Sequence, residues 1–167
     1  MVDTVNDFEG TRPDVPNVAA ICSIPYSWKR LSRHLPHKRL RSRRLPEVSF
    51  LTDIYGSQDR RNGMAVMRRT DEIDVVMNLG YFMEDNFEEL TEELQEIKES
   101  CRHAHLKVIL ETGALVTAEN IQKASILAMY SGADFIKTST GKGYPGATFE
   151  AAYTMCKAIK PTIHHRK

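Results

Sequence analysis

Short apolar runs alternate with amphipathic stretches along the C-terminal half of the chain. Residues 73–79 (IDVVMNL) and 106–112 (LKVILET) are short and rich in β-branched side chains, a composition typical of strands buried on both faces. Between them, residues 87–101 place apolar side chains at helical spacing and glutamate at most other positions. This pattern predicts an amphipathic helix with Asp85 or Asn86 as its N-cap.

The alternation continues, so that strands recur at roughly the length of one βα unit. The remaining predicted elements are a strand over 17–24, a helix over 118–131 begun by Thr117 and ended by Gly132, a strand over 133–140, and a helix from Thr148 to Ile159, stopped by Pro161. We expect the strands at 17–24, 73–79, 106–111 and 134–138 to be adjacent, parallel and in chain order. A (β/α)8 barrel and a doubly wound sheet both fit this pattern.

Residues 27–70 interrupt the alternation. They show weak periodicity, dense arginine and no convincing buried strand. Residues 28–45 alone hold eight Lys and Arg, and we expect residues 28–46 to be largely exposed, because so many cations are costly to bury unpaired. One alternative function follows, a basic nucleic-acid-binding segment at 28–44, although it has only Trp28 for stacking and no recognisable motif.

Overall composition changes this picture little. Hydrophobic residues make up 41% of the 167 residues, charged residues 27%, and the net charge is +1, which is typical of a soluble globular protein and favours neither nucleic acid nor a membrane as partner. The three cysteines are scattered and lack metal-ligand spacing, which indicates a reducing compartment. The N-terminal residues lack the apolar region of a signal peptide, so the expected location is the cytoplasm.

Several polar residues fall inside the apolar strand runs, at the strand ends where parallel α/β folds collect functional groups. Lys137 lies in DFIKTSTG, and a lysine held away from water in a barrel mouth would keep some neutral amine for attack on a carbonyl. Asp74, the second residue of the run at 73–79, is the second candidate. Glu111 and Lys107 share one face of the strand at 106–112 and could form a buried pair. A surface ion pair for Lys137 and a structural cap for Asp74 are the alternatives.

The strings NVAAIC, DEIDVVMN, LKVILETG, KAS and GADFIKTSTG occur in this order along the chain, and the order and spacing resemble the deoxyribose-phosphate aldolases. The resemblance covers about 17–24 and 71–160. It implies a TIM (β/α)8 barrel that splits 2-deoxyribose 5-phosphate into acetaldehyde and glyceraldehyde 3-phosphate without metal or organic cofactor. It also implies a role for each matching residue: Lys137 forms the imine, Asp74 relays protons, Cys22 lines the substrate pocket, and Thr140, Gly141 and Lys142 lie near the substrate phosphate.

The chain also departs from the family pattern. The second active-site lysine of the family lies in a later KPAGG-like strand, and Lys160 in IKPTIHHRK does not match it. The final barrel strands are expected to be missing, and residues 27–70 lack the family's third strand and its following helix, which suggests an out-of-frame stretch. We therefore expect a single partial barrel domain over residues 1–167, with about four or five βα units.

Three expectations about function follow from these departures. The isolated chain should be nearly inactive as an aldolase, and a non-catalytic, partly folded remnant is the main alternative. The expected partner is a phosphorylated sugar substrate, with neither nucleic acid nor a membrane. A homo-oligomer is left open, because exposed strand edges invite association.

Overall fold

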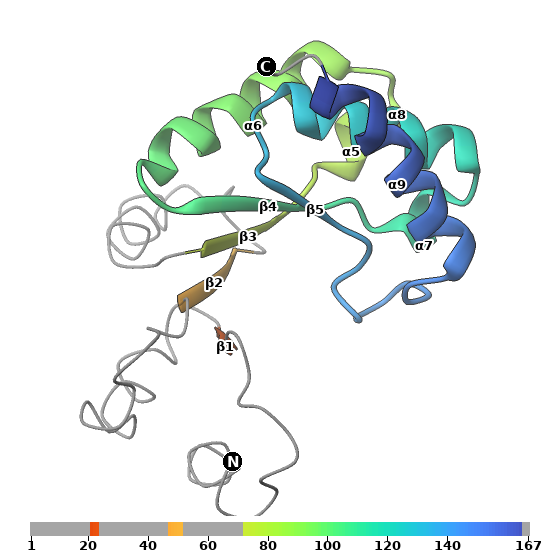
Figure 1. Cartoon of the computed structure of the whole chain (residues 1–167), viewed down its shortest axis with the longest axis horizontal. Helices are drawn as coiled ribbons and strands as arrows, with labels where there is room; N and C mark the ends of the chain where they lie inside the picture. Colours follow the sequence, from red (N-terminus) through yellow and green to blue (C-terminus); the bar gives the residue numbers. More distant parts are fainter. Residues whose placement is uncertain (1–20, 24–46, 52–71, 165–167) are drawn as a thin grey trace, which may run out of the picture.

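Five strands form one sheet in the computed structural model, which describes residues 21–23, 47–51 and 72–164, with side chains described over 72–161. All neighbouring strands pair in parallel, and their order in the sheet follows their order in the chain (Figure 1). The strands are β1 (Ile21–Ser23), β2 (Glu47–Leu51), β3 (Glu72–Val76), β4 (His105–Ile109) and β5 (Phe135–Lys137). The predicted parallel order is confirmed, although the observed strands β3, β4 and β5 are shorter than the apolar runs that predicted them.

Strand β2 corrects the expectation that residues 27–70 contain no strand. It lies between β1 and β3, with Cys22 opposite Val48 and Phe50 opposite Asp74. Its EVSFL sequence is brief and stands among basic residues, so the local pattern is weak. Pairing with a strand on each side supplies the backbone hydrogen bonds that this segment needs, and such tertiary context overrides weak local preference. The predicted exposure of 28–46 and the nucleic-acid hypothesis for 28–44 concern residues that are not described.

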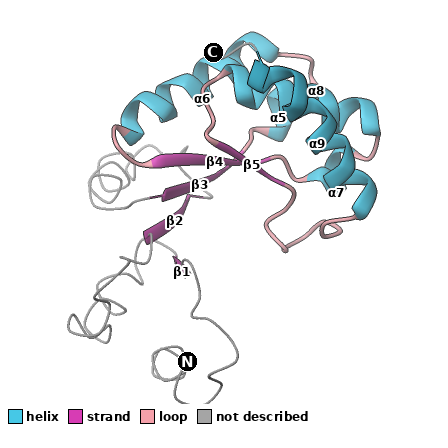
Figure 2. Cartoon of the chain, in the orientation of Figure 1, coloured by secondary structure: helices cyan, strands magenta, loops and turns pink. Residues whose placement is uncertain are grey.

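The described helices lie together on one side of the sheet (Figure 2). The three predicted helices are present, and two short ones, α5 and α7, were not predicted. The helices are α5 (Leu79–Met83), α6 (Phe87–Cys101), α7 (Thr112–Leu115), α8 (Ala118–Tyr130) and α9 (Phe149–His164). None of these described helices is long and apolar enough to cross a membrane.

Two helix ends show how far the sequence predictions hold. Thr117 caps α8 as expected, because its side chain accepts a hydrogen bond from the backbone N–H of Asn120 at 3.2 Å. The expected stop at Pro161 is wrong, since α9 continues through it to His164. Proline removes one backbone donor from the helix. That loss is tolerable here because α9 ends at His164, three residues after Pro161.

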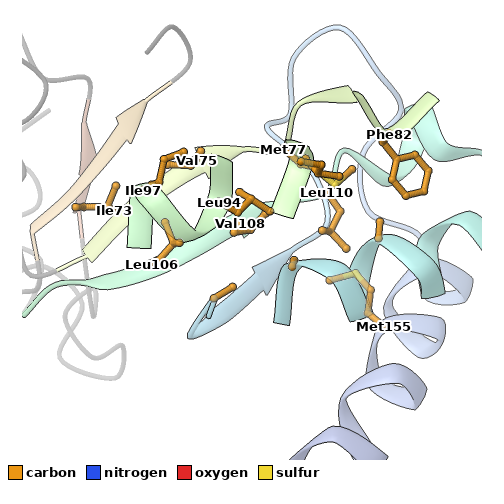
Figure 3. Packing of buried hydrophobic residues seen from close by; sticks show 14 of the residues in the cluster. Ile73, Val75, Met77, Phe82, Leu94, Ile97, Leu106, Val108, Leu110 and Met155 are labelled. Atoms are coloured by element: carbon orange, nitrogen blue, oxygen red, sulfur yellow. The ribbon is translucent and has the colours of Figure 1, made fainter. Parts of the chain in front are cut away.

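Alternate residues of β3 and β4 face the helices and form the core with them (Figure 3). Ile73 and Leu106 are partners across these two strands, as are Val75 and Val108, and all four are buried. They belong to one hydrophobic cluster with Leu90, Leu94 and Ile97 of α6 and with Leu115, Ile121, Ala124, Ala128, Ala151 and Met155 of the later helices. The residues between them on β3 and β4 must therefore face the opposite side of the sheet.

Asp134 ties helix α6 to the sheet at the edge of this core. Its carboxylate accepts hydrogen bonds from the Lys98 ammonium and, at 2.8 Å, from the backbone N–H of Leu106. Burial raises the pKa of Asp134, but these two hydrogen bonds and the nearby positive charges of Lys98 and His105 outweigh it. The pKa of Asp134 therefore lies below its ordinary value of 3.8.

This arrangement decides between the two fold classes that the sequence left open. In a doubly wound fold, helices cover both faces of the parallel sheet. In a (β/α)8 barrel, the strands follow chain order and the helices surround the outside. The described helices lie on one side, and the described strands follow chain order. The fold is an incomplete barrel of the TIM type. The face of the sheet that carries no described helix, called the helix-free face below, corresponds to the barrel interior.

Candidate active site

The helix-free face of the sheet brings Lys137 and Asp74 together. Lys137 ends β5, Asp74 lies in β3, and β4 runs between these two strands. Their side chains reach across β4, so that the Lys137 ammonium donates a hydrogen bond to Asp74 Oδ2 at 2.9 Å. The predicted proximity of the two residues is confirmed. An amine and a carboxylate in contact form the minimal set for nucleophilic attack with proton transfer.

The two partners of this ion pair differ sharply in their contact with water. The Asp74 side chain is 3% exposed, whereas that of Lys137 is 40% exposed. The expectation that Lys137 lies in a desolvated mouth is therefore not met. The reason lies in the sheet, because β5 is the last strand among those described and nothing described pairs with its outer edge.

One oxygen of Asp74 is left for other partners. Oδ2 is bonded to Lys137, while Oδ1 is buried and has no hydrogen-bond partner among the described residues. A buried carboxylate oxygen without a partner is costly in free energy. Such an atom is well suited to accept a proton, directly or through water, from a hydroxyl group on a bound ligand.

A second ion pair lies on the same face, and it corrects the expected pairing of Lys107 with Glu111. Lys107 instead pairs with Glu72 of β3, and its ammonium lies 5.8 Å from the ring centroid of Phe135. The strand register places Lys107 beside Asp74 and Phe135. The helix-free face therefore carries two cations and two carboxylates across three neighbouring strands.

Glu111 serves a different purpose from the one expected. It is 3% exposed, and its two carboxylate oxygens accept hydrogen bonds from the backbone N–H of Thr140 at 3.0 Å and from the Thr140 hydroxyl at 2.8 Å. The sequence analysis placed Glu111 inside a strand, whereas β4 ends at Ile109 and Glu111 is the N-cap of α7, and it missed this partner. The only signal for it was an acidic residue closing an apolar run, which does not identify a contact 29 residues away.

The residues expected near a substrate phosphate form a turn directly after Lys137. The backbone N–H of Lys142 donates to the Thr140 hydroxyl oxygen at 3.1 Å, which closes the turn. Gly141 has a φ of 78°, and no atom lies within 4 Å of the place where its Cβ would be. Gly141 and Lys142 are exposed, so the turn is open to a ligand. Cys22 lies in β1, and its side chain is outside the described residues.

Comparison with known proteins first identifies the class of enzyme. The fold resembles a solved structure described as "QR15, an Aldolase", with a TM-score of 0.75 and 28% sequence identity, covering 95% of this chain and 68% of that one. A family model described as DeoC/LacD family aldolase matches residues 64–164. The chain therefore belongs to the DeoC/LacD aldolase family.

Curated relatives carry a more specific name. The chain is 46% identical over 97 residues to the deoxyribose-phosphate aldolase of Homo sapiens, covering 58% of this chain and 30% of that protein. It is 51% identical over 92 residues to the deoxyribose-phosphate aldolase of Metamycoplasma hominis, covering 55% of this chain and 42% of that protein. The matches thus span less than half the length of these relatives.

Proposed function

We propose that this chain carries the imine-forming half of a class I aldolase site, with 2-deoxy-D-ribose 5-phosphate as the substrate. The observation that carries the proposal is the contact between the Lys137 amine and the buried Asp74 carboxylate. A lysine of this kind adds to an aldehyde carbonyl, and loss of water gives an imine. The family name of the relatives supports the choice of substrate.

The proposed reaction begins when the neutral amine of Lys137 attacks C1 of the open-chain sugar. Proton transfers to the resulting oxygen expel water and leave a protonated imine. The C2–C3 bond then breaks, and its electron pair moves into the imine to form an enamine. The C3 hydroxyl loses its proton and becomes the aldehyde of glyceraldehyde 3-phosphate. Protonation of the enamine at C2, followed by hydrolysis, releases acetaldehyde and restores the amine.

Asp74 supplies the proton transfers in this proposal. Its Oδ2 already contacts the amine and its Oδ1 lacks a described partner, so Oδ2 can accept the amine proton first. Once the carboxylate has passed that proton to the leaving hydroxyl, Oδ1 can accept a proton from the C3 hydroxyl. General acid–base help of this kind typically accelerates a reaction by ~10²–10⁴-fold.

The turn at Thr140–Lys142 is the proposed contact for the substrate phosphate. The exposed Lys142 side chain offers a positive charge, and Gly141 lets a ligand approach the backbone closely. Cys22 is proposed to line the pocket on the far side of the sheet from β5, since β1 and β5 are the outermost described strands. No metal or organic cofactor is needed for any step.

Borohydride reduction tests this proposal, because it converts an imine into a stable secondary amine. With 2-deoxyribose 5-phosphate or acetaldehyde present, intact-mass measurement should find one reduced adduct on the wild-type chain and none on Lys137→Ala. Lys157→Ala removes an exposed lysine of α9 and serves as the matched control. Equal labelling of all three chains would refute the role of Lys137 and favour a non-catalytic chain.

A further inference from the structure

Glu111 is a buried carboxylate that the proposed chemistry does not use. Both of its oxygens are occupied by Thr140, one by the backbone N–H and one by the hydroxyl. With both oxygens engaged in this way, Glu111 is poorly placed to act as a proton acceptor for substrate. The same bonds orient the Thr140 hydroxyl, whose oxygen then accepts the backbone N–H of Lys142. Glu111 thus orients the acceptor of the hydrogen bond between the Lys142 N–H and the Thr140 hydroxyl, which closes the turn after Lys137.

The backbone at Glu111 is held in a conformation that suits this task. Its φ is 53° and its ψ is 58°, in the left-handed region that residues other than glycine and asparagine seldom adopt. This conformation ends the extended backbone of β4 and starts α7, and it sends the Glu111 side chain to the turn. Such strain persists only where surrounding contacts hold it in place.

Further contacts fix the same turn to the end of β4. The backbone N–H of Leu110 donates to the Lys137 carbonyl at 2.9 Å, and that of Thr112 donates to the Thr138 carbonyl at 2.8 Å. Gly113 also packs so closely against the later part of the loop that a Cβ there would lie 2.5 Å from the Pro145 carbonyl oxygen. The backbone bonds hold the start of the turn, and Glu111 is the described residue whose charged group hydrogen-bonds to Thr140 within it.

We infer that Glu111 is a positioning residue that shapes the turn Thr140–Lys142 for a phosphate group, and so sets the preference for phosphorylated over unphosphorylated aldehydes. This inference rests on the proposed function, because it assigns the turn to the substrate phosphate. A carboxylate that accepts two hydrogen bonds from one residue restrains both its backbone and its side chain. Without it, the Thr140 hydroxyl keeps only its longer hydrogen bond to the Lys142 carbonyl, at 3.2 Å, and the Lys142 N–H loses a firmly held acceptor.

Hydrogen exchange in the ligand-free chain tests the positioning by itself. In Glu111→Ala, the amides of Thr140 and Lys142 should exchange ~10–100-fold faster, the factor expected for losing a hydrogen bond to a charged group. The amide of Val108 in β4 should keep its wild-type rate. Glu111→Gln keeps the shape and can still bond both Thr140 groups, so its effect should stay below about fivefold. Glu92→Ala, which removes an exposed carboxylate from α6, is the matched control.

Two results of this measurement would overturn the inference. If Glu111→Ala leaves the Thr140 and Lys142 amides at their wild-type rates, Glu111 does not hold the turn. If Val108 exchanges faster by the same factor, Glu111 supports the whole fold and has no particular role in the turn. Neither result depends on imine formation, so the positioning is tested even if the proposed chemistry fails.

Borohydride trapping then tests the link to phosphate. The ratio of trapping rates for 2-deoxyribose 5-phosphate and for 2-deoxyribose measures the phosphate preference of each chain. We expect the wild type to favour the phosphorylated sugar, Glu111→Ala to lose about tenfold of that preference, since a misplaced group commonly costs ~10–100-fold, and Glu111→Gln to retain most of it. The inference would be overturned if the wild type trapped both sugars at the same rate, or if the ratio of trapping rates were the same in Glu111→Ala as in the wild type. Absence of any Lys137 adduct would instead refute the proposed function.

Discussion

Replacing Asp74 with asparagine removes the charge of the proposed proton acceptor while keeping its shape. The Lys137–Asp74 hydrogen bond is 2.9 Å long, and the Asp74 side chain is 3% exposed. Removing one partner of a fully buried ion pair typically costs 3–5 kcal/mol, because the other charge stays buried without a partner. Here the partner left behind is Lys137, which is 40% exposed and can be hydrated by water.

The wild-type carboxylate is also imperfectly stabilised, since Asp74 Oδ1 lacks a described hydrogen-bond partner. A buried acceptor without a partner costs ~1–3 kcal/mol, and asparagine removes the charge that makes this burial most costly. The two effects oppose each other. We therefore expect the free energy of unfolding of Asp74→Asn to fall by no more than about 1 kcal/mol. The rate of imine trapping should fall by ~10²–10⁴-fold, the usual contribution of general acid–base catalysis.

Chemical denaturation and borohydride trapping of acetaldehyde measure these two quantities on the same protein. Their combination discriminates between a functional pair and a structural pair. A loss of 3–5 kcal/mol in unfolding free energy, with trapping unchanged, would refute the reasoning and show that the pair only supports the fold.

Four further outcomes follow from the described residues. The free energy of unfolding of the wild type should exceed that of Asp134→Asn at neutral pH, and this difference should disappear as pH falls from 3.8 through the lowered pKa of Asp134. A difference that does not change with pH would contradict this. Burial raises the pKa of Cys101 to about 11, so alkylation at mildly alkaline pH should require unfolding, and rapid alkylation of the folded chain would disprove its burial. Gly113→Ala should lower the free energy of unfolding by ~1–3 kcal/mol through overpacking against Pro145. Unchanged stability would show that the loop around Pro145 moves aside to accept the methyl group. Aldehyde release from 2-deoxyribose 5-phosphate should be far slower than the ~1–10³ s⁻¹ of ordinary enzymes, because Lys137 is 40% exposed; turnover in that range would contradict the reasoning.

The sequence predicted the parallel order of the sheet because that order depends on local patterns. The runs at 73–79 and 106–112 are apolar enough to identify buried strands, and Thr117 marks the start of α8 by its own chemistry. The strand at Glu47–Leu51 could not be found in this way, since its EVSFL sequence is brief, stands among basic residues and gives only a weak local pattern. The continuation of α9 past Pro161 also escaped prediction, because proline near a helix end costs far less than proline in its centre.

For the candidate site, the sequence identified the polar residues correctly but predicted their contacts less well. Lys137 and Asp74 were identified as polar residues inside apolar strands, and the parallel register brings them into contact across β4. The pairing of Glu111 with Thr140 depends on a left-handed backbone turn, which no local pattern indicated. The exposure of Lys137 depends on what covers the outer edge of β5, and a pattern within β5 carries no information about that.

The most direct test of the account is to locate the reduced adduct after the chain is treated with acetaldehyde and borohydride. Peptide mapping by mass spectrometry compares Lys137 with Lys107, which lies on the same face of the sheet and is paired with Glu72. We predict that the added ethyl group is found on Lys137 and that Asp74→Asn reduces this labelling. Adduct on Lys107 or spread over exposed lysines, with Lys137 unmodified, would contradict the assignment of Lys137 as the imine-forming residue.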